Sequence, residues 1–224
     1  MNDEPLFPPV EDADEDGVLC YGGHLSPGIV LEAYRNGIFP WPHRDCPLLW
    51  FAPPERAVLC FDEFHVNART KRDLRKQNFR ISFDEAFSQV IAACAAPRFY
   101  EGEWEENTWI NPDVVACYTE LHRYGWVHSV EAWQEGELVG GLYGVLIGAH
   151  FCGESMFHLV PNASKACVIA LVERLKVCGA IWLDIETMTP HFERMGAREI
   201  PRAQFMDWMR QAQSQPLKTS EKSL

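Results

Sequence analysis

Acidic residues interrupt two apolar stretches of this chain. Glu154 lies within the run 138–157, which is rich in strand-forming residues, and Asp184 and Glu186 follow the apolar segment 180–183. Burying a carboxylate is costly unless the group is paired or used in chemistry. In a regular strand, residues 184 and 186 point to the same face. We therefore expect these acids to serve a site that performs chemistry.

Three other chemical interpretations fit parts of the same region. Residues 153–157 begin like a nucleophile elbow, but Phe157 stands where the second glycine is needed, which disfavours a serine hydrolase. His150 and Cys152 share a strand face and are interpreted as packed residues, since two side chains do not make a metal site. An acyl-CoA acetyltransferase is the stronger alternative, although the loop 160–165 has no glycine to bring backbone N–H groups to a phosphate.

The elements expected to position the acids form a mixed α+β layer. Strand signals cluster between residues 127 and 157, with a turn at 135–137, and another strand is expected at 180–186. Helices are predicted at the following ranges: 26–37, 111–125, 189–196, 84–95, 164–178 and 201–211. The first three start with a capping residue followed by proline and end at glycine. Antiparallel strands, a helix and a returning strand describe a sheet with flanking helices.

Composition suggests three parts and a reduced, cytoplasmic protein. The chain has 224 residues and a net charge of −12, and its first 16 residues carry seven acids and no Lys or Arg. We expect a flexible acidic lead at 1–17, a small N-terminal domain at 18–56 and a larger domain at 57–224, because 38–56 contains five prolines and is a plausible boundary. The eight cysteines show no metal-finger spacing, and no secretory leader or membrane span is indicated.

A basic run contrasts with the acidic composition. It comprises six residues: Arg69, Lys71, Arg72, Arg75, Lys76 and Arg80. Such a run is either a solvated helix surface or a patch that contacts the phosphates of a nucleic acid.

Nine segments occur in order along the chain: GGHLSP (22–27), AYRNGIFPW (33–41), LLWFAPPERAVL (48–59), TWI (108–110), LHRYGWVHSVEAW (121–133), LVGGLYG (138–144), FCGESMF (151–157), NASK (162–165) and GAREIPR (196–202). Together they resemble the family of leucyl/phenylalanyl-tRNA–protein transferases. The resemblance implies a mixed, largely antiparallel α+β fold with an acetyltransferase-like C-terminal domain and a small N-terminal domain. The implied reaction moves Leu or Phe, and by extension Met, from aminoacyl-tRNA to proteins with N-terminal Arg or Lys, which marks them for degradation.

The resemblance also implies residue roles. Glu154 falls on the glutamate that recognises the acceptor, and Asp184 on the catalytic aspartate. The terminal adenosine of the tRNA would stack on Trp41, Trp109 and Tyr34. The aminoacyl side chain would occupy a pocket formed by Leu142, Phe151, Met156, Leu171 and Leu183. The basic run would contact the acceptor stem.

No cofactor or metal is implied, and the chain is expected to act as a monomer away from membranes. An acyl-CoA-dependent enzyme and a non-catalytic relative that binds aminoacyl-tRNA or degrons remain as alternatives.

Glu186 departs from the family pattern, which has Asp-x-Gln where this chain has Asp184-Ile185-Glu186. A smaller departure is His24 in place of aspartate. We hypothesise that Glu186 accepts the amine proton during transfer, that Asp184 holds it in place, and that the two carboxylates share a proton because they repel each other. The alternative is that Glu186 is an exposed acid at a strand end.

Overall fold

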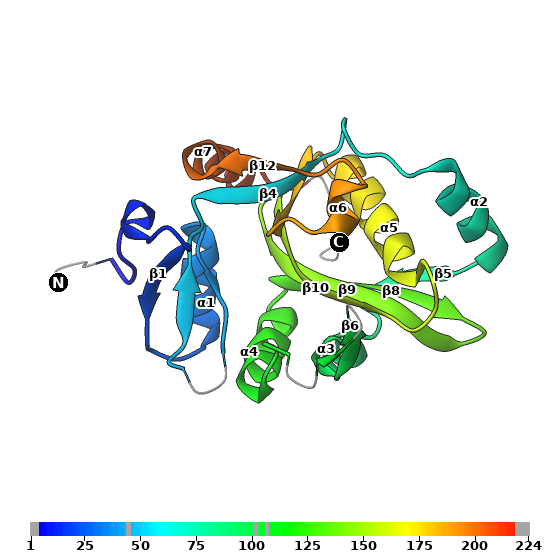
Figure 1. Ribbon diagram of the computed structural model, residues 1–224, viewed down its shortest axis with the longest axis horizontal. Helices are drawn as coiled ribbons and strands as arrows, with labels where there is room; N and C mark the ends of the chain where they lie inside the picture. The colour runs from blue at the N-terminus through cyan, green and yellow to red at the C-terminus, as the bar shows by residue number, and fades with distance from the viewer. Residues whose placement is uncertain (1–4, 44–45, 101–102, 106–107, 218–224) are drawn as a thin grey trace.

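A seven-stranded sheet forms the centre of the molecule (Figure 1). The computed structural model describes residues 5–43, 46–100, 103–105 and 108–217. In spatial order the strands are β12 (Arg198–Pro201), β4 (Glu55–Cys60), β11 (Trp182–Glu186), β10 (His150–His158), β9 (Glu137–Ile147), β8 (Val127–Gln134) and β5 (Arg80–Phe83). All neighbours are antiparallel except β10 and β11, which are parallel. The predicted mixed, largely antiparallel sheet is confirmed.

The connections between strands follow from local sequence. Glu135 and Gly136 join β8 to β9 with φ of 53° and 88°, the positive values that a two-residue hairpin turn requires. The parallel pair β10 and β11 needs a crossover, which is α5 (Ala163–Val177).

Helices cover both faces of this sheet. Figure 1 shows α3 (Phe87–Ala95) and α4 (Pro112–Arg123) on one side and α5 on the other. The remaining helices are α1 (Pro27–Arg35), α2 (Ala68–Gln77), α6 (Pro190–Glu193) and α7 (Arg202–Gln213). No helix in the described part of the chain is long and apolar enough to cross a membrane.

The predicted helix starts are largely correct. Proline occupies the first position of α1, α4 and α6, and the side chains of Asn111 and Thr189 accept hydrogen bonds from the N–H groups of Val114 and Phe192. The helix predicted from residue 84 begins three residues later, because the Asp84 carboxylate instead accepts the N–H of Ser129 at 2.9 Å.

A three-stranded sheet precedes the central one in the chain. It has the order β1 (Val18–Tyr21), β3 (Leu49–Phe51) and β2 (Phe39–Pro40), and α1 lies beside it (Figure 1). A short pair, β6 (Arg98–Tyr100) and β7 (Glu103–Glu105), precedes α4.

Part of the acidic lead packs against the rest of the chain. Phe7 and Val10 are buried, and the ring of Phe7 meets Trp50 edge-on at 4.9 Å between centroids. Val10 begins a 3-10 turn (Val10–Asp12), and its carbonyl accepts a 2.7 Å hydrogen bond from Arg202. Two apolar side chains among the acids therefore anchor the segment; residues 1–4 lie outside the described residues.

Candidate active site

Three neighbouring strands bring the predicted acids to one face of the sheet. Cys152 of β10 is in register with Asp184 of β11, and Asp184 is in register with Val58 of β4. Paired residues on neighbouring strands point to the same face of a sheet, and so do residues two apart along one strand. Arg56, two residues before Val58, therefore points to the same face as Asp184. The observed contacts agree with this placement.

Asp184 is buried and saturated with hydrogen-bond donors. Its side chain has 0% exposure, and Arg56 donates to it from Nε and Nη2, both at 2.9 Å. His150 Nε2 lies 3.1 Å from Oδ2, and the backbone N–H of Glu186 donates to Oδ1 at 2.9 Å. Burial alone would raise the pKa of Asp184, but Arg56 and His150 hold this pKa well below its usual value. Asp184 is therefore a fixed anion that orients its neighbours.

Glu186 follows a break in the strand. The pairing with β4 shifts between Asp184 and Glu186, and Glu186 has φ of 62°, which is uncommon for a residue with a side chain. Its carboxylate oxygen Oε1 lies 3.4 Å from the Cys152 thiol and 3.7 Å from Arg56 Nη2. The side chain is 13% exposed, which excludes the alternative of an exposed acid at a strand end. Burial raises the pKa of Glu186 to about 7, despite the opposing charge of Arg56.

Glu154 reaches the same cluster from β10. Tyr118 of α4 donates to its Oε2 at 3.3 Å, while Oε1 is buried and has no hydrogen-bond partner among the described residues. The Tyr34 and Tyr118 hydroxyls are 2.8 Å apart; because Tyr118 uses its proton on Glu154, Tyr34 donates to Tyr118. Burial and the charge of Glu186 raise the pKa of Glu154 well above its usual value.

The two carboxylates that lie close enough to repel each other are therefore those of Glu154 and Glu186. One carboxylate oxygen of each and the Cys152 sulfur lie within 4.8 Å of one another. The hypothesis that Asp184 and Glu186 share a proton is wrong, since Asp184 is already paired with Arg56. A raised pKa in both glutamates instead favours one proton between them.

The sequence interpretation missed Arg56 and gave His150 only a packing role. Arg56 is 2% exposed, and its guanidinium lies 4.6 Å from the Phe39 ring centroid and 4.8 Å from that of Phe205. Gln213 donates toward His150 Nδ1 at 3.4 Å, which leaves Nε2 as the donor to Asp184. The family-like segment 48–59 contains Arg56, but only the register of β4 and β11 reveals its partner.

The predicted aminoacyl pocket residues lie mainly in the core. Met156 is in register with Leu142, and Phe151 with Leu146, which places them on the opposite face to Cys152 and Asp184. Exposure is 5% or less for four of the five: Leu142, Phe151, Leu171 and Leu183. These four residues line no open recess in this conformation, so the pocket remains a prediction.

Of the three predicted stacking aromatics, Trp41 is the most open. It is 36% exposed, and Trp109 is half-buried against the core. A pocket of about 550 Å³ includes Pro42 and Asn111, which lie close in sequence to these two tryptophans. Tyr34 is 1% exposed and its hydroxyl meets that of Tyr118, so its ring offers no open face for stacking in this conformation.

The basic run divides between α2 and β5. Five of its six residues lie on α2 (Arg69, Lys71, Arg72, Arg75 and Lys76), and all five are exposed. Arg80 lies on β5, where both its terminal nitrogens bind Glu85, at 2.6 and 3.1 Å. Arg80 is therefore already engaged in an ion pair, unlike most of the α2 group.

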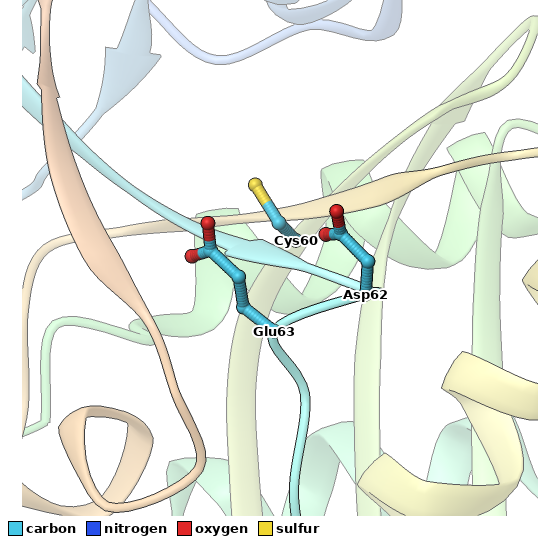
Figure 2. Close-up of side chains that lie close together, drawn as sticks. All are labelled: Cys60, Asp62 and Glu63. Atoms are coloured by element: carbon cyan, nitrogen blue, oxygen red, sulfur yellow. The ribbon is translucent and has the colours of Figure 1, made fainter.

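Two groups of described side chains have donor atoms close enough for a metal ion. One is the Cys152 cluster above; the other is Cys60, Asp62 and Glu63, which project to one side of the chain (Figure 2). Arg198 donates to Glu63 at 3.0 Å and to Cys60 at 3.7 Å, and Arg56 lies against the first cluster. Each group already faces a fixed guanidinium, so we assign a metal to neither.

Comparison with known proteins covers nearly the whole chain. Residues 58–210 match the family model for leucyl/phenylalanyl-tRNA protein transferase, and residues 23–54 match the model for its N-terminal domain. The leucyl/phenylalanyl-tRNA–protein transferase of Syntrophotalea carbinolica is 46% identical over 214 residues, which cover 96% of this chain and 92% of the relative. The protein of that name from Pseudomonas fluorescens is 46% identical over 212 residues, with coverage of 94% and 92%.

A solved structure, L-PGS from Bacillus licheniformis, aligns with 73% of this chain and 52% of its own, at a TM-score of 0.43 and 11% identity. That similarity is too low to support an argument.

Proposed function

The chain belongs to the leucyl/phenylalanyl-tRNA protein transferase family, and we propose that it moves Leu or Phe, and also Met, from aminoacyl-tRNA to proteins whose N-terminal residue is Arg or Lys. It is an aminoacyltransferase, and its product is a peptide bond that marks the acceptor for degradation. We place the reaction in the cytoplasm, with the chain acting as a monomer. The observation that carries the site assignment is the clustering of Glu154, Glu186 and the Arg56–Asp184 pair.

The reaction is aminolysis of an ester. The acceptor's α-amino nitrogen attacks the aminoacyl carbonyl carbon, and the tRNA ribose oxygen leaves as a hydroxyl after taking up a proton. An α-amino group has a pKa of about 7.7–8.0, so a useful fraction is neutral at physiological pH. The enzyme must therefore align the reactants and move one proton from nitrogen to the leaving oxygen.

Glu186 is assigned as the proton carrier. A base works best when its pKa lies near the working pH, and burial raises the pKa of Glu186 to about 7. Asp184 is a positioning residue, because it accepts the Glu186 backbone N–H and anchors Arg56. The positive φ of Glu186 is a strained conformation that this hydrogen bond supports.

Glu154 is assigned to the acceptor's N-terminal side chain. Its Oε1 is buried and unpartnered among the described residues, which is costly in the absence of a cation. A guanidinium or ammonium group satisfies this oxygen, and the ion pair is strengthened where water is excluded.

The donor's side chain is assigned to the face opposite Asp184. The pairing of β10 with β9 shifts register between Gly153 and Ser155, and the pairing of β11 with β4 shifts between Asp184 and Glu186. Both shifts lie next to the paired residues Cys152 and Asp184. We propose that the aminoacyl side chain enters the sheet at these two register shifts. There it reaches the predicted pocket residues Leu142, Phe151, Met156, Leu171 and Leu183. An apolar pocket separates similar side chains by only about 1–3 kcal/mol, which accommodates Met beside Leu and Phe.

The tRNA is assigned to two further surfaces. Trp41 and Trp109 would stack the terminal adenosine whatever the tRNA body. The exposed cations of α2 would contact phosphates of the acceptor stem.

A transfer assay tests this function directly. The full chain is incubated with radiolabelled Leu-tRNA and a peptide beginning with Arg, and label entering the peptide is counted. The same peptide with an acetylated N-terminus must stay unlabelled. Label retained on tRNA throughout would favour a non-catalytic relative, and binding of coenzyme A would favour the acyl-CoA alternative.

Glu154→Gln tests acceptor recognition in the same assay. Peptides beginning with Arg, Lys and Ala are compared with both proteins. The variant is expected to lose most of the preference for Arg and Lys over Ala, and unchanged selectivity would rule out the assignment.

A further inference from the structure

We propose that Glu154 and Glu186 act as one unit that holds a single proton between two carboxylates, and that the positively charged side chain of the acceptor's N-terminal residue displaces this proton on binding. Glu186 is then a second determinant of acceptor specificity. The inference deepens the proposed function and rests on it for the nature of the acceptor.

Few neighbouring groups are placed to hydrogen-bond or neutralise the carboxylates of Glu154 and Glu186. A carboxylate oxygen of each lies within the same 4.8 Å cluster as the Cys152 sulfur. Glu154 Oε1 is buried and unpartnered among the described residues, while the Glu186 oxygen has a thiol at 3.4 Å and Arg56 only at 3.7 Å. Ionising both of two buried carboxylates this close to each other is unfavourable, so the pair retains one proton in total.

The surrounding groups cannot supply that cation. Arg56 of β4 is directed at Asp184 of β11 through two hydrogen bonds of 2.9 Å, so the charges of this pair largely cancel. From β10, Cys152 has a thiol pKa raised well above its usual value by burial and by the charges of Asp184 and Glu186, so it stays protonated. His150, also of β10, carries its proton toward Asp184.

Three buried tyrosines face the pair from the helical side, namely Tyr34 of α1, Tyr118 of α4 and Tyr143 of β9. Burial and the charge of Glu154 raise the pKa of each well above its usual value. They remain neutral, and only Tyr118 donates a hydrogen bond to Glu154, so the charge of the carboxylates stays unbalanced.

An incoming Arg or Lys side chain changes this balance. A cation beside Glu154 replaces the shared proton, which leaves to solvent, and Glu186 becomes ionised. Glu186 can then accept the proton of the attacking amine. A neutral acceptor side chain leaves the proton in place and the base unavailable, so recognition of charge also activates the site.

The carboxyl carbons of glutamate report the protonation of the pair directly. The full chain is labelled with ¹³C at glutamate Cδ, and NMR spectra are recorded from pH 5 to 9 for wild type, Glu154→Gln, Glu186→Gln and the double variant. In wild type, the Cδ signals of Glu154 and Glu186 are expected to shift together near neutral pH. Each single variant is expected to move the remaining carboxyl's apparent pKa down by one unit or more, and the double variant removes the signal.

Arginine amide, which mimics a charged N-terminal residue, is then added, with citrulline amide as the neutral control of similar shape. Arginine amide is expected to lower the apparent pKa of the wild-type pair, and citrulline amide to leave it unchanged. The affinity of arginine amide for wild type, divided by its affinity for Glu186→Gln, is expected to fall about tenfold for each pH unit below the pKa of the pair. The relative measure cancels titration of the ligand's own amine.

Two carboxyls that titrate independently below pH 5, or equal pH dependence in wild type and Glu186→Gln, would overturn the shared proton. The transfer assay keeps the two proposals separate. A shared titration without transfer of Leu would refute the function and leave the pair standing, whereas transfer with independent titrations would do the reverse.

Discussion

Replacing Glu186 by Gln should stabilise the protein, and by an amount that depends on pH. The substitution keeps the shape of the side chain and removes its ability to ionise. Glu186 has a pKa raised from 4.5 to about 7 by burial. Below pH 4.5 the side chain is protonated in both the folded and unfolded states, so wild type and variant should have similar free energies of unfolding.

The difference develops as the pH rises. Between pH 4.5 and 7 the unfolded chain releases this proton while the folded chain retains it, which lowers the stability of wild type relative to the variant. The shift of about 2.5 units, at about 1.36 kcal/mol per unit, corresponds to roughly 3 kcal/mol, reached just above pH 7. For a chain of this length that is a difference of about 6–12 °C in melting temperature.

Denaturant unfolding of both proteins at pH 4.5, 6 and 8 measures this difference. Glu137→Gln, at an exposed position at the start of β9, is the matched control for the same chemical change at the surface. A constant difference between wild type and Glu186→Gln across this range, or one that shrinks with rising pH, would refute the assigned environment of Glu186.

Three further predictions concern the surroundings of the site. Asp184→Ala leaves the buried Arg56 cation unpaired and should cost about 3–5 kcal/mol of stability by denaturant unfolding and orders of magnitude in transfer rate; near-normal transfer would contradict its positioning role. Gly144→Ala should cost about 1–3 kcal/mol in the same measurement, because the new Cβ meets the Cys152 carbonyl and the Phe151 ring, and a neutral effect would contradict this packing. Neutralising Lys71, Arg75 and Lys76 together should reduce the slope of log affinity for tRNA against log salt by about 2. Arg80→Gln, already paired with Glu85, should leave the slope unchanged; an unchanged slope in the triple variant would show that these α2 cations do not contact phosphates.

Much of the fold could be predicted from local signals. The turn at Glu135 and Gly136, the prolines that begin α4 and α6, and the alternation in β8 each act within a few residues. The strands β2, β4 and β12 could not be predicted, since they are stabilised by pairing with other strands and not by a strong pattern of their own. The packing of the lead could not be predicted for a related reason: Phe7 is a single apolar residue among acids, and only its contact with Trp50 orders it.

The sequence by itself determined which residues have the chemistry for the site. Glu154, Asp184 and Glu186 stood out because ionisable groups are costly in apolar surroundings. The same criterion would also select Glu131, another buried acid, whose carboxylate is held by the hydroxyls of Ser82 and Ser129 and serves the structure. Residue type and local pattern do not distinguish these cases.

Only the tertiary structure decided which acid is charged. Asp184 is a fixed anion because Arg56, 128 residues away in the chain, donates two hydrogen bonds to it. Glu186, two residues from Asp184, has a pKa raised to about 7, because burial and the charge of Asp184 outweigh the opposing charge of Arg56. Protonation depends on burial and on charges within a few ångströms, and those distances are set when strands distant in the sequence pair with each other.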